Sequence, residues 1–542
     1  MTNFEKKLAM RQTLFKKKST KDSNIKKRIE CIISYSKNKR ENNLMKRRNI
    51  QVTSKNEKSS LKKEFDLKEA LNRLPQIVNQ LSCENPQLQF QATQQIRMIL
   101  AIETDPPIDQ VVSYDIIPTL VNFLRQSKNE ALQFEAAWTL TNIASGTSKH
   151  TELIVKSNTI PVFVELIRSS NEKTQEQAIW ALGNIAGDCV EYRDLVLSFD
   201  TVNYLICIIR TTKNLSLKRN AAWSLSNLCR GKPSPDFEMI KKVLPILLEL
   251  LKTQVKLIII DACWSLAHLS SNSLINIQTI LDANICPILA KLIKMESPEI
   301  RAPVLRCIGN LVTGNHKQTQ MVLDCNILSS LKGLLLIGST FFRTETCWAL
   351  SNICAGTYQQ IQMVIEAGFL PCLKNIIMND SFPVQKQAGW ALANMIDGGL
   401  KSQIRYLANN GAIPQLCNML LINDGLILKV TLAAIEKVLK IGEDDAQKNG
   451  FIQNKYIICF EESDGFQKID KLQNHSNRSV SMLATYLCYG YFSDDSDGDD
   501  DYDSDDDDQE DFGMENGQNI FKTFFQQNKP TISILNYPKK EL

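Results

Sequence analysis

The chain has 542 residues, with 63 Lys and Arg against 59 Asp and Glu, and is too long for one compact core of about 100–200 residues. Its four histidines form no metal-ligand or triad pattern, its fifteen cysteines form no CxxC pair, and no GxxxxGK[ST] loop occurs, which argues against an enzyme, a metal site or a cofactor. Cys229, Cys263 and Cys347 lie within apolar phrases, so we expect buried free thiols of a reducing compartment.

The N-terminal segment, residues 1–63, is basic. Residues 1–48 hold 16 Lys and Arg against four acids, and such a segment is expected to be disordered alone and to act as an interaction arm. The start has no apolar signal core, and no run of about 18 apolar residues occurs. We therefore expect a soluble, intracellular protein without a membrane segment.

One phrase then returns every 41–43 residues between about Leu71 and Phe492. Every tryptophan of the chain falls on this register, and Arg306 takes the tryptophan position in RCIGNLVTG. Such a period indicates a helical solenoid of armadillo or HEAT repeats. The phrases are WTLTNIASG at Trp138, WALGNIAGD at Trp180, WSLSNLCRG at Trp223, WSLAHLSS at Trp264, WALSNICAG at Trp348 and WALANMIDG at Trp390.

A second marker, a proline before an apolar run, recurs in each repeat. Proline suits the first helical position, so each repeat is predicted to contain a short helix, a turn, a proline-started helix and the Trp/Asn helix. Glycine after each phrase, as at Gly146 and Gly314, suits a helix C-cap. The predicted fold is all-α: a right-handed superhelical solenoid of about ten armadillo repeats over residues 64–493, with atypical end repeats. The prolines are Pro118, Pro161, Pro287, Pro371 and Pro414.

Tryptophan and asparagine lie four residues apart in each phrase, on one helical face. Apolar neighbours such as Leu182 and Ile185 would face the core, which leaves the Trp/Asn ladder on the concave surface of the solenoid. The alternative is that these residues only stabilise repeat stacking. Stacked asparagines would bring unsatisfied polar groups, so an exposed binding ladder is favoured.

The ladder has the chemistry to bind an extended basic peptide. An asparagine amide can clamp a peptide backbone through its carbonyl and N–H groups, and tryptophan walls accept an aliphatic stem that ends in a cation. Acids lie nearby, although each alone is also consistent with a solvated surface charge. These acids are Glu135, Glu176, Asp188, Asp261 and Glu345.

The chain ends in an acidic tail, residues 494–542. Residues 494–511 hold 13 acids and no base, which indicates an interaction tail or a passive solubilising one. Ser496 and Ser504 each have an acid three residues on, a context that acidophilic kinases favour.

The ladder phrases, with MRQTLFKKKST, KKRIE and NKRENNLMKRRN near the start, closely resemble importin-α. The resemblance implies a nuclear import adaptor that binds basic nuclear localisation signals and joins them to importin-β. It also implies shuttling between cytoplasm and nucleus, and recycling by an export receptor with Ran-GTP through the tail and last repeat. Lys46-Arg47-Arg48-Asn49 stands in the place of the autoinhibitory signal mimic. The implied arm residues are Arg11, Lys16, Lys17, Lys18, Lys26, Lys27, Arg28, Lys39, Arg40, Lys46, Arg47 and Arg48.

The resemblance also implies two cargo sites. In the major site Gly146, Thr151 and Asp188 would hold the key lysine. Its walls, clamps and acids would be Trp138, Asn142, Trp180, Asn184, Trp223, Asn227, Glu176 and Asp261. The minor site would use Arg306, Asn310, Glu345, Trp348, Asn352, Trp390 and Asn394.

Three positions depart from the family pattern. His268 replaces the usual Tyr or Asn and is interpreted as a polar surface residue rather than a pH sensor. Gln387 and His316 stand where acids commonly flank the minor site, which predicts a weakened minor site unless nearby acids compensate.

Two rival interpretations remain. An armadillo scaffold for other extended peptides would lack the basic start and the regular asparagines. A nucleic-acid binder would use residues 1–63 as its arm, but that arm has few aromatic residues for stacking, namely Phe4, Phe15 and Tyr35, so no direct nucleic-acid binding is expected.

Overall fold

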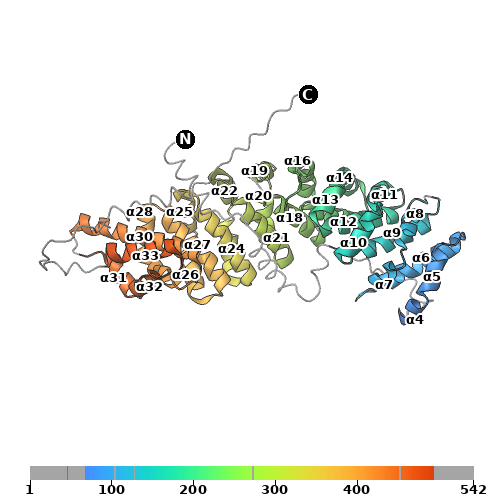
Figure 1. Ribbon diagram of the computed structural model, residues 1–542. Helices are drawn as coiled ribbons and strands as arrows, with labels where there is room; N and C mark the ends of the chain where they lie inside the picture. The colour runs from blue at the N-terminus through green and yellow to red at the C-terminus, as the bar shows by residue number, and fades with distance from the viewer. Residues whose placement is uncertain are drawn as a thin grey trace, which may run out of the picture. The chain divides into compact units, whose positions relative to one another are not determined.

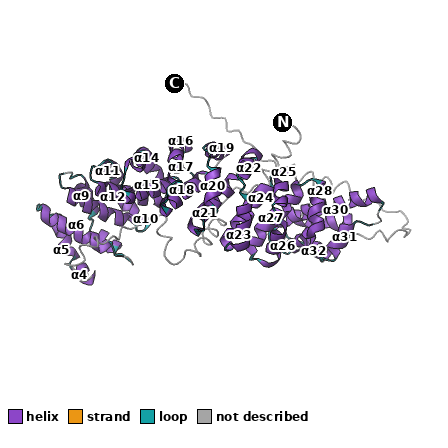
Figure 2. Ribbon diagram, turned by 180° about the vertical axis from the view of Figure 1, so that it is seen from behind, coloured by secondary structure: helices purple, strands orange, loops and turns teal. Residues whose placement is uncertain are grey.

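The computed structural model describes Lys46 and residues 67–102, 105–126, 128–271, 274–450 and 453–492. Helices and connecting turns make up these residues, and no strand occurs among them (Figure 2). The chain divides into two units, Met1–Gly356 and Thr357–Leu542, each considered by itself (Figure 1). The expected all-α solenoid of helical repeats is confirmed.

The first unit is organised around the long third helix of each repeat, which we call the ladder helix. Consecutive ladder helices pack against each other in chain order, so each repeat contacts its neighbours, as in other solenoids. The ladder helices of this unit are α6 (Pro86–Leu100), α9 (Glu130–Ala144), α12 (Glu172–Asp188), α15 (Leu215–Leu228), α18 (Lys256–Leu269), α21 (Pro298–Leu311) and α24 (Thr340–Cys354).

Shorter helices complete the repeats of the first unit. They are α4 (Leu67–Asn72), α5 (Leu74–Leu81), α7 (Ile108–Val112), α8 (Ile117–Leu124), α10 (Ser148–Lys156), α11 (Thr159–Leu166), α13 (Val190–Leu197), α14 (Thr201–Thr211), α16 (Phe237–Ile240), a 3₁₀ turn (Lys241–Val243), α17 (Leu244–Leu250), α19 (Leu274–Asp282), α20 (Cys286–Leu292), α22 (His316–Leu323) and α23 (Leu328–Ile337).

The second unit has two ladder helices, α27 (Phe382–Gly398) and α30 (Gly425–Asn449), which pack together. The last helix packs on α30 and closes the unit. The other helices are α25 (Tyr358–Glu366), α26 (Leu370–Asn379), α28 (Lys401–Leu407), a π-helical turn (Ala408–Ala412), α29 (Ile413–Met419), α31 (Lys455–Glu461), α32 (Gly465–Leu472) and α33 (Arg478–Tyr491).

Asparagine caps fix where several ladder helices begin. Asn129, Asn171 and Asn214 each accept backbone N–H groups of the first turn through the side-chain oxygen. Such a cap satisfies donors that the helix itself leaves unpaired. Each cap lies nine residues before a tryptophan, so the caps repeat with the same period as the ladder.

A left-handed residue precedes the second helix of most repeats. Asp115, Asn158, Asn284, Gly368 and Gly411 all have positive φ, a conformation that Gly, Asn and Asp tolerate best. The predicted break before the proline is confirmed. The prolines mostly stand second in their helices, as in Ile117–Leu124, and Pro161 stands third in α11.

The glycines after the ladder phrases lie at or near the ends of their helices, as expected; Gly146, for example, follows the C-cap Ser145. Apart from Gly231, none of them has a positive φ, so a left-handed backbone is not what requires glycine there. A Cβ at Gly146 would collide with the His150 ring, and one at Gly314 with the Gln318 side chain. His150 Nδ1 accepts from Thr147 N (3.1 Å) and Gln318 Oε1 from Asn315 N (2.9 Å). Glycine is required because these capping side chains approach the backbone closely.

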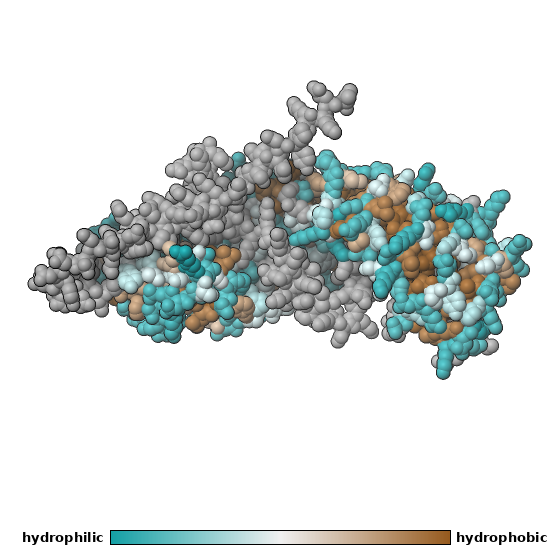
Figure 3. Space-filling model, in the orientation of Figure 1, coloured by the Kyte–Doolittle hydropathy of each residue, from teal (hydrophilic) through white to brown (hydrophobic). Residues whose placement is uncertain are grey.

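The core lies between the helices, as the pattern predicts. Leu182 and Ile185 are buried, and so are Cys229, Cys263 and Cys347. Burial raises the pKa of the Cys229 thiol to about 12, which keeps it protonated and unreactive. Some apolar side chains reach the surface: Figure 3 shows hydrophobic areas over the N-terminal helices, interrupted by hydrophilic residues, as is usual for soluble folds.

Candidate functional site

The ladder asparagines are buried, which corrects the expectation of an exposed ladder. None of Asn142, Asn184, Asn227, Asn310, Asn352 and Asn394 is more than 4 % exposed. Three of them donate a side-chain N–H to a main-chain oxygen of the preceding ladder helix. The acceptors are Thr141 O for Asn184 (3.1 Å), Gly183 O for Asn227 (2.8 Å) and Ala267 O for Asn310 (2.7 Å). These three asparagines therefore join neighbouring repeats, which is the stacking role given above as the alternative.

The tryptophans are also packed between repeats. Trp223, Trp348 and Trp390 are buried, and Trp138 nearly so, whereas Trp180 and Trp264 keep partial exposure. A Cβ at Gly183 would lie 2.5 Å from Trp223 Cζ3, and one at Gly309 would collide with Trp348. The glycine in these phrases makes room for the next tryptophan.

A tripod of oxygens holds the ammonium group of Lys46. Lys46 Nζ lies 2.8 Å from Gly146 O, 2.7 Å from Thr151 Oγ1 and 2.7 Å from Asp188 Oδ1. The Asp188 side chain is 5 % exposed, so the ion pair is shielded from water. The structure brings together the three residues named for the key lysine, and a lysine of the predicted mimic occupies them.

Local structure fixes these three ligands. The first is the carbonyl of Gly146, beyond the end of α9, and Asp188 ends α12. Thr151 Oγ1 lies 3.3 Å from Ala144 O, so it can donate there while it accepts from the lysine. Ser148 Oγ donates to Asp188 Oδ1 (3.0 Å) and orients that carboxylate. The pocket offers acceptors in three directions, which suits an ammonium group with three N–H donors.

Two of the predicted cation-binding acids already have arginine partners. Arg97 Nε lies 2.7 Å from Glu135 Oε2, and Arg306 Nη2 lies 3.0 Å from Glu345 Oε1. Both acids are buried, where an unpaired charge would be costly. Their expected role as open cation seats is therefore corrected. The sequence reasoning missed Arg97 because it looked only for acids beside tryptophans.

Glu176 and Asp261 differ from these two. Glu176 Oε1 accepts from Asn220 Nδ2 (2.7 Å) and from Ser216 Oγ. Asp261 is 3 % exposed. Both acids lie in the same unit as the Lys46 pocket, whose oxygens come from Gly146, Thr151 and Asp188.

The Gly–Thr arrangement of the first pocket recurs, which the sequence reasoning missed. Gly314 and Thr319 repeat the Gly-x₄-Thr spacing of Gly146 and Thr151, four repeats later. Thr319 Oγ1 lies 3.3 Å from Val312 O, the same distance as Thr151 to Ala144 O. Gly356 stands where the first pocket has Asp188, so this pocket lacks the carboxylate. The repeated spacing was the signal that could have revealed it.

Other predicted minor-site residues are distributed over both units. Arg306, in the tryptophan position, lies over the Trp348 ring at 5.7 Å. Trp390 and Asn394 belong to the second unit. Gln387, also there, is 6 % exposed, and its side-chain oxygen has no hydrogen-bond partner.

His268 is half-buried rather than fully exposed. Its ring stacks on Trp264 at 5.8 Å. Burial, reinforced by the charges of Arg230 and Arg306, lowers its pKa to about 3. The ring is therefore neutral at physiological pH. His316 is half-buried at the first position of α22.

Several named residues lie outside the described part of the chain. They are Arg11, Lys16, Lys17, Lys18, Lys26, Lys27, Arg28, Lys39, Arg40, Arg47, Arg48 and Asn49, and all of residues 494–511.

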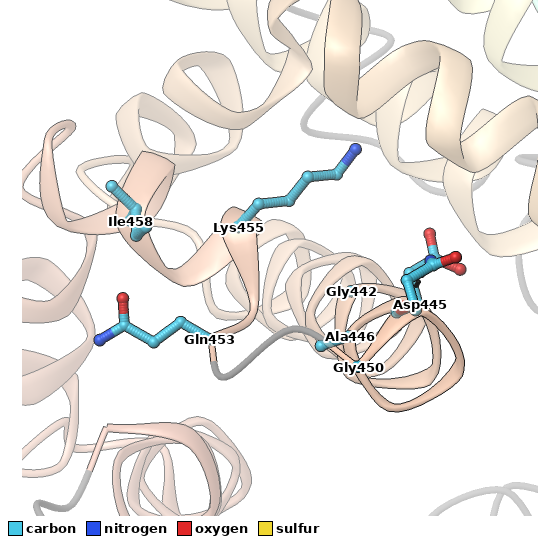
Figure 4. Close-up of a pocket in the computed structure, with 8 residues that line it drawn as sticks. Gly442, Asp445, Ala446, Gly450, Gln453, Lys455 and Ile458 are labelled. Carbon is cyan, nitrogen blue, oxygen red and sulfur yellow. Dashed lines mark hydrogen bonds between the residues drawn. The ribbon is translucent and has the colours of Figure 1, made fainter.

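A separate hollow of about 760 Å³ lies in the second unit (Figure 4), between the end of α30 and the start of α31. Its charged residues already have partners: Asp445 binds Arg405 (2.7 Å from Nε to Oδ2), and Lys455 Nζ donates to Asn409 Oδ1 (3.1 Å). None of the Trp and Asn residues of the ladder phrases lines this hollow, so it is not the predicted site.

The described residues offer neither a metal site nor a single membrane-spanning helix. No group of His, Cys, Asp or Glu in them could hold a metal ion. No single described helix is long and apolar enough to cross a membrane, although the bent pair α25 and α26 passes that test together.

Comparisons with known proteins agree on one family. Residues 11–94 match the importin beta binding domain, and residues 454–510 match an atypical Arm repeat, as expected for a last repeat. The armadillo/beta-catenin-like repeat matches residues 104–145, 147–187, 189–230, 275–313, 315–355 and 357–397.

Two relatives match over most of their length. The chain is 48 % identical over 489 residues to importin subunit alpha-B of Dictyostelium discoideum, covering 90 % of the chain and 94 % of the relative. It is 37 % identical over 528 residues to importin subunit alpha-4 of Arabidopsis thaliana, covering 94 % and 95 %. An engineered protein of known structure matches with a TM-score of 0.69 at 24 % identity, over 76 % of the chain and 97 % of that protein, and supports the fold alone.

Proposed function

The chain belongs to the importin-α family and is a nuclear import adaptor that binds importin-β and nuclear localisation signals. From this we propose which residues bind the cargo. The cargo's key lysine binds the tripod of Gly146, Thr151 and Asp188. The proposal rests on Lys46, whose ammonium group lies within 2.8 Å of an oxygen of each of these three residues. A cargo lysine presents the same group to the same oxygens.

The ladder binds the rest of the signal in this proposal. One N–H of the Asn184 amide bonds to Thr141 O, and we assign its second N–H and its carbonyl to the peptide backbone. Asn142 and Asn227 act in the same way. Trp138, Trp180 and Trp223 take the aliphatic stems, with partly exposed Trp180 offering the most surface.

Autoinhibition follows from the same contacts. Lys46 competes with cargo for the tripod, and its covalent tether makes the competition intramolecular, at an effective concentration that can reach about the millimolar range. Importin-β that captures the basic arm withdraws Lys46 and frees the pocket. Import is then coupled to assembly of the three-part complex.

The second cargo site is the weaker one. The pocket of Gly314 and Thr319 lacks a carboxylate, since Gly356 replaces the aspartate, and Glu345 is engaged by Arg306. In the first unit Asn310, Trp348 and Asn352 keep the clamps and walls. Gln387 and His316 add no negative charge.

Recycling and localisation complete the proposal. An export receptor with Ran-GTP returns the adaptor, helped by the acidic tail and the last repeat, so the protein shuttles between cytoplasm and nucleus. Pull-down of that receptor with and without residues 494–511 tests the role of the tail. Equal capture by both forms would contradict that role.

The main test is titration of the full-length Lys46→Ala variant, the parent in this test, with a lysine-rich signal peptide, because Lys46 would otherwise compete for the same oxygens. Asp188→Asn keeps the shape of the pocket but removes its charge, so affinity should fall at least about tenfold, as expected for loss of a charge-assisted bond in a shielded site. Asp194→Asn is the control, because Asp194 is exposed and pairs with Arg193. Equal affinities of the Asp188→Asn variant and the parent would refute the assignment.

A further inference from the structure

Arg97 occupies a seat that has the chemistry of a cargo-lysine site. Its guanidinium lies over the Trp138 ring at 4.3 Å, and its Nε lies 2.7 Å from Glu135 Oε2. Gln94 Nε2 donates to the other oxygen of Glu135 (3.3 Å). Arg97, Glu135 and Trp138 are 9 %, 5 % and 9 % exposed. An aromatic face beside a carboxylate suits a cation, and here the protein supplies its own.

Arg306 likewise lies over Trp348 and pairs with Glu345, but from the tryptophan position of its helix. Arg97 comes from a different position of the repeat. Arg97 lies twelve residues after the N-cap Asn85. The same position holds Thr141 in α9 and Gly183 in α12, counted from their own caps. Gly183 packs against the next tryptophan, Trp223. The ladder helices α12 and α21 therefore place a glycine, Gly183 or Gly309, against the next tryptophan, whereas α6 places an arginine there.

The helix that would carry the first rung also lacks its aromatic residue. Gln94 stands nine residues after Asn85, where the next four ladder helices have tryptophan. At this position α6 therefore offers an amide and not a second tryptophan wall. A cargo lysine that reached this point would meet a buried guanidinium instead of a carboxylate.

From these contacts we propose that Arg97 is a specificity-determining residue that ends the cargo groove at the second repeat. It keeps the seat of Trp138 and Glu135 closed to cargo cations, so the signal is read only by the repeats that follow. Trp138 still serves as a wall through the part of its ring that Arg97 leaves uncovered. This inference rests on the proposed function, because it concerns the limit of the same groove.

The test compares peptides that differ at their ends. All proteins are full-length and carry Lys46→Ala, which removes the competing internal lysine. A core lysine-rich peptide is extended at either end by one Lys or one Ala, and the ratio of the two Kd values is measured by calorimetry for each end. In the Lys46→Ala parent both ratios should be near one.

Arg97→Ser gives the first repeat a small residue, as in the inner repeats, and exposes Glu135. At one end the lysine-extended peptide should then bind roughly tenfold tighter than the alanine-extended one, the scale of a charge-assisted contact. Arg97→Ser with Glu135→Gln should lose that preference, because the acid is gone. Arg125→Ser, at an exposed arginine of the same unit, should behave like the parent.

A buried Glu135 without a partner destabilises the fold, so a second variant protects the test. Arg97→Gln keeps an N–H donor for Glu135 but removes the guanidinium charge. The Arg97→Gln variant should fold and should also prefer the lysine-extended peptide, with a smaller ratio of the two Kd values. If neither variant prefers lysine at either end, or if the parent already does, Arg97 does not limit the groove. A parent that does not bind the core peptide contradicts the proposed function itself, a result distinct from unaltered end ratios.

Discussion

In the proposed function, a single asparagine serves both the fold and the cargo. The Asn184 side chain is fully buried and joins α12 to α9 through Thr141 O. A polar group in such a place stabilises only when it is satisfied. Removal of the amide would leave Thr141 O with only its partner in the same chain segment, the Ser145 N–H at 3.1 Å. Structural and binding roles of the ladder therefore cannot be separated residue by residue.

Asn184→Ala should accordingly lower both stability and affinity. Loss of the bond to Thr141 O should reduce the free energy of unfolding by about 1–2 kcal/mol, and loss of the backbone clamp should weaken peptide binding by about 1–3 kcal/mol. Urea unfolding and calorimetric titration measure the two effects. Asn203→Ala, at an exposed residue bonded to Asp200, is the control and should change neither. Unchanged stability of the Asn184→Ala variant would argue against the inter-repeat bond.

His268 makes stability depend on acid. Its folded pKa of about 3 lies below the ordinary 6.5 because of burial and of Arg230 and Arg306. Below about pH 6.5 the unfolded chain binds a proton that the folded chain does not, so stability falls as pH falls. Between pH 7 and pH 5 this histidine should cost roughly 1–2 kcal/mol. His268→Gln should lose less stability over that range in urea unfolding, and equal losses would contradict the assignment.

At the scale of the helices, the repeated spacing made most of the fold predictable. The Trp phrases, the prolines and the left-handed residues located the elements of each repeat. The reason for Gly146 was not predictable, because it depends on where the His150 ring points. The same holds for Glu135: the sequence shows an acid near Trp138, but its arginine partner comes from another repeat, 38 residues away in the chain.

The two Gly-x₄-Thr pockets, each built where a ladder helix meets the helix after it, provide a paired test. Thr151→Val should weaken a lysine peptide selective for the first pocket by roughly tenfold and leave one selective for the second unchanged. Thr319→Val should do the reverse, with a smaller loss because no carboxylate assists that pocket. Fluorescence anisotropy with the two peptides measures both. If both variants affect the same peptide, the pockets do not act separately.

At the scale of the whole molecule, a basic arm is joined to a groove that binds basic peptides. Lys46 lies about 100 residues before Gly146 in the chain, yet the two are in contact. A tethered competitor lowers the apparent affinity for any free peptide by a factor set by its effective concentration. The arm thus sets the threshold for cargo binding.

Deleting residues 1–63 should therefore tighten binding of a free basic peptide. A gain of about tenfold or more is expected if the arm occupies the pocket most of the time. Lys46→Ala in the full chain should give a part of that gain, since one contact is lost and the rest of the arm remains. Calorimetry on the three proteins compares them. Equal affinities for all three would rule out autoinhibition through Lys46.

The inter-repeat bonds of Asn184 and Asn227 also bear on how such a chain can change in length. Each amide donates to a main-chain oxygen, which every residue carries whatever its side chain. After duplication or loss of one whole repeat of about 42 residues, each ladder asparagine would therefore still find an equivalent main-chain oxygen as its acceptor. A shift by any other length would break the register of the bonds. The fold admits growth in whole repeats, and a longer groove can arise from one genetic event without redesign of its walls.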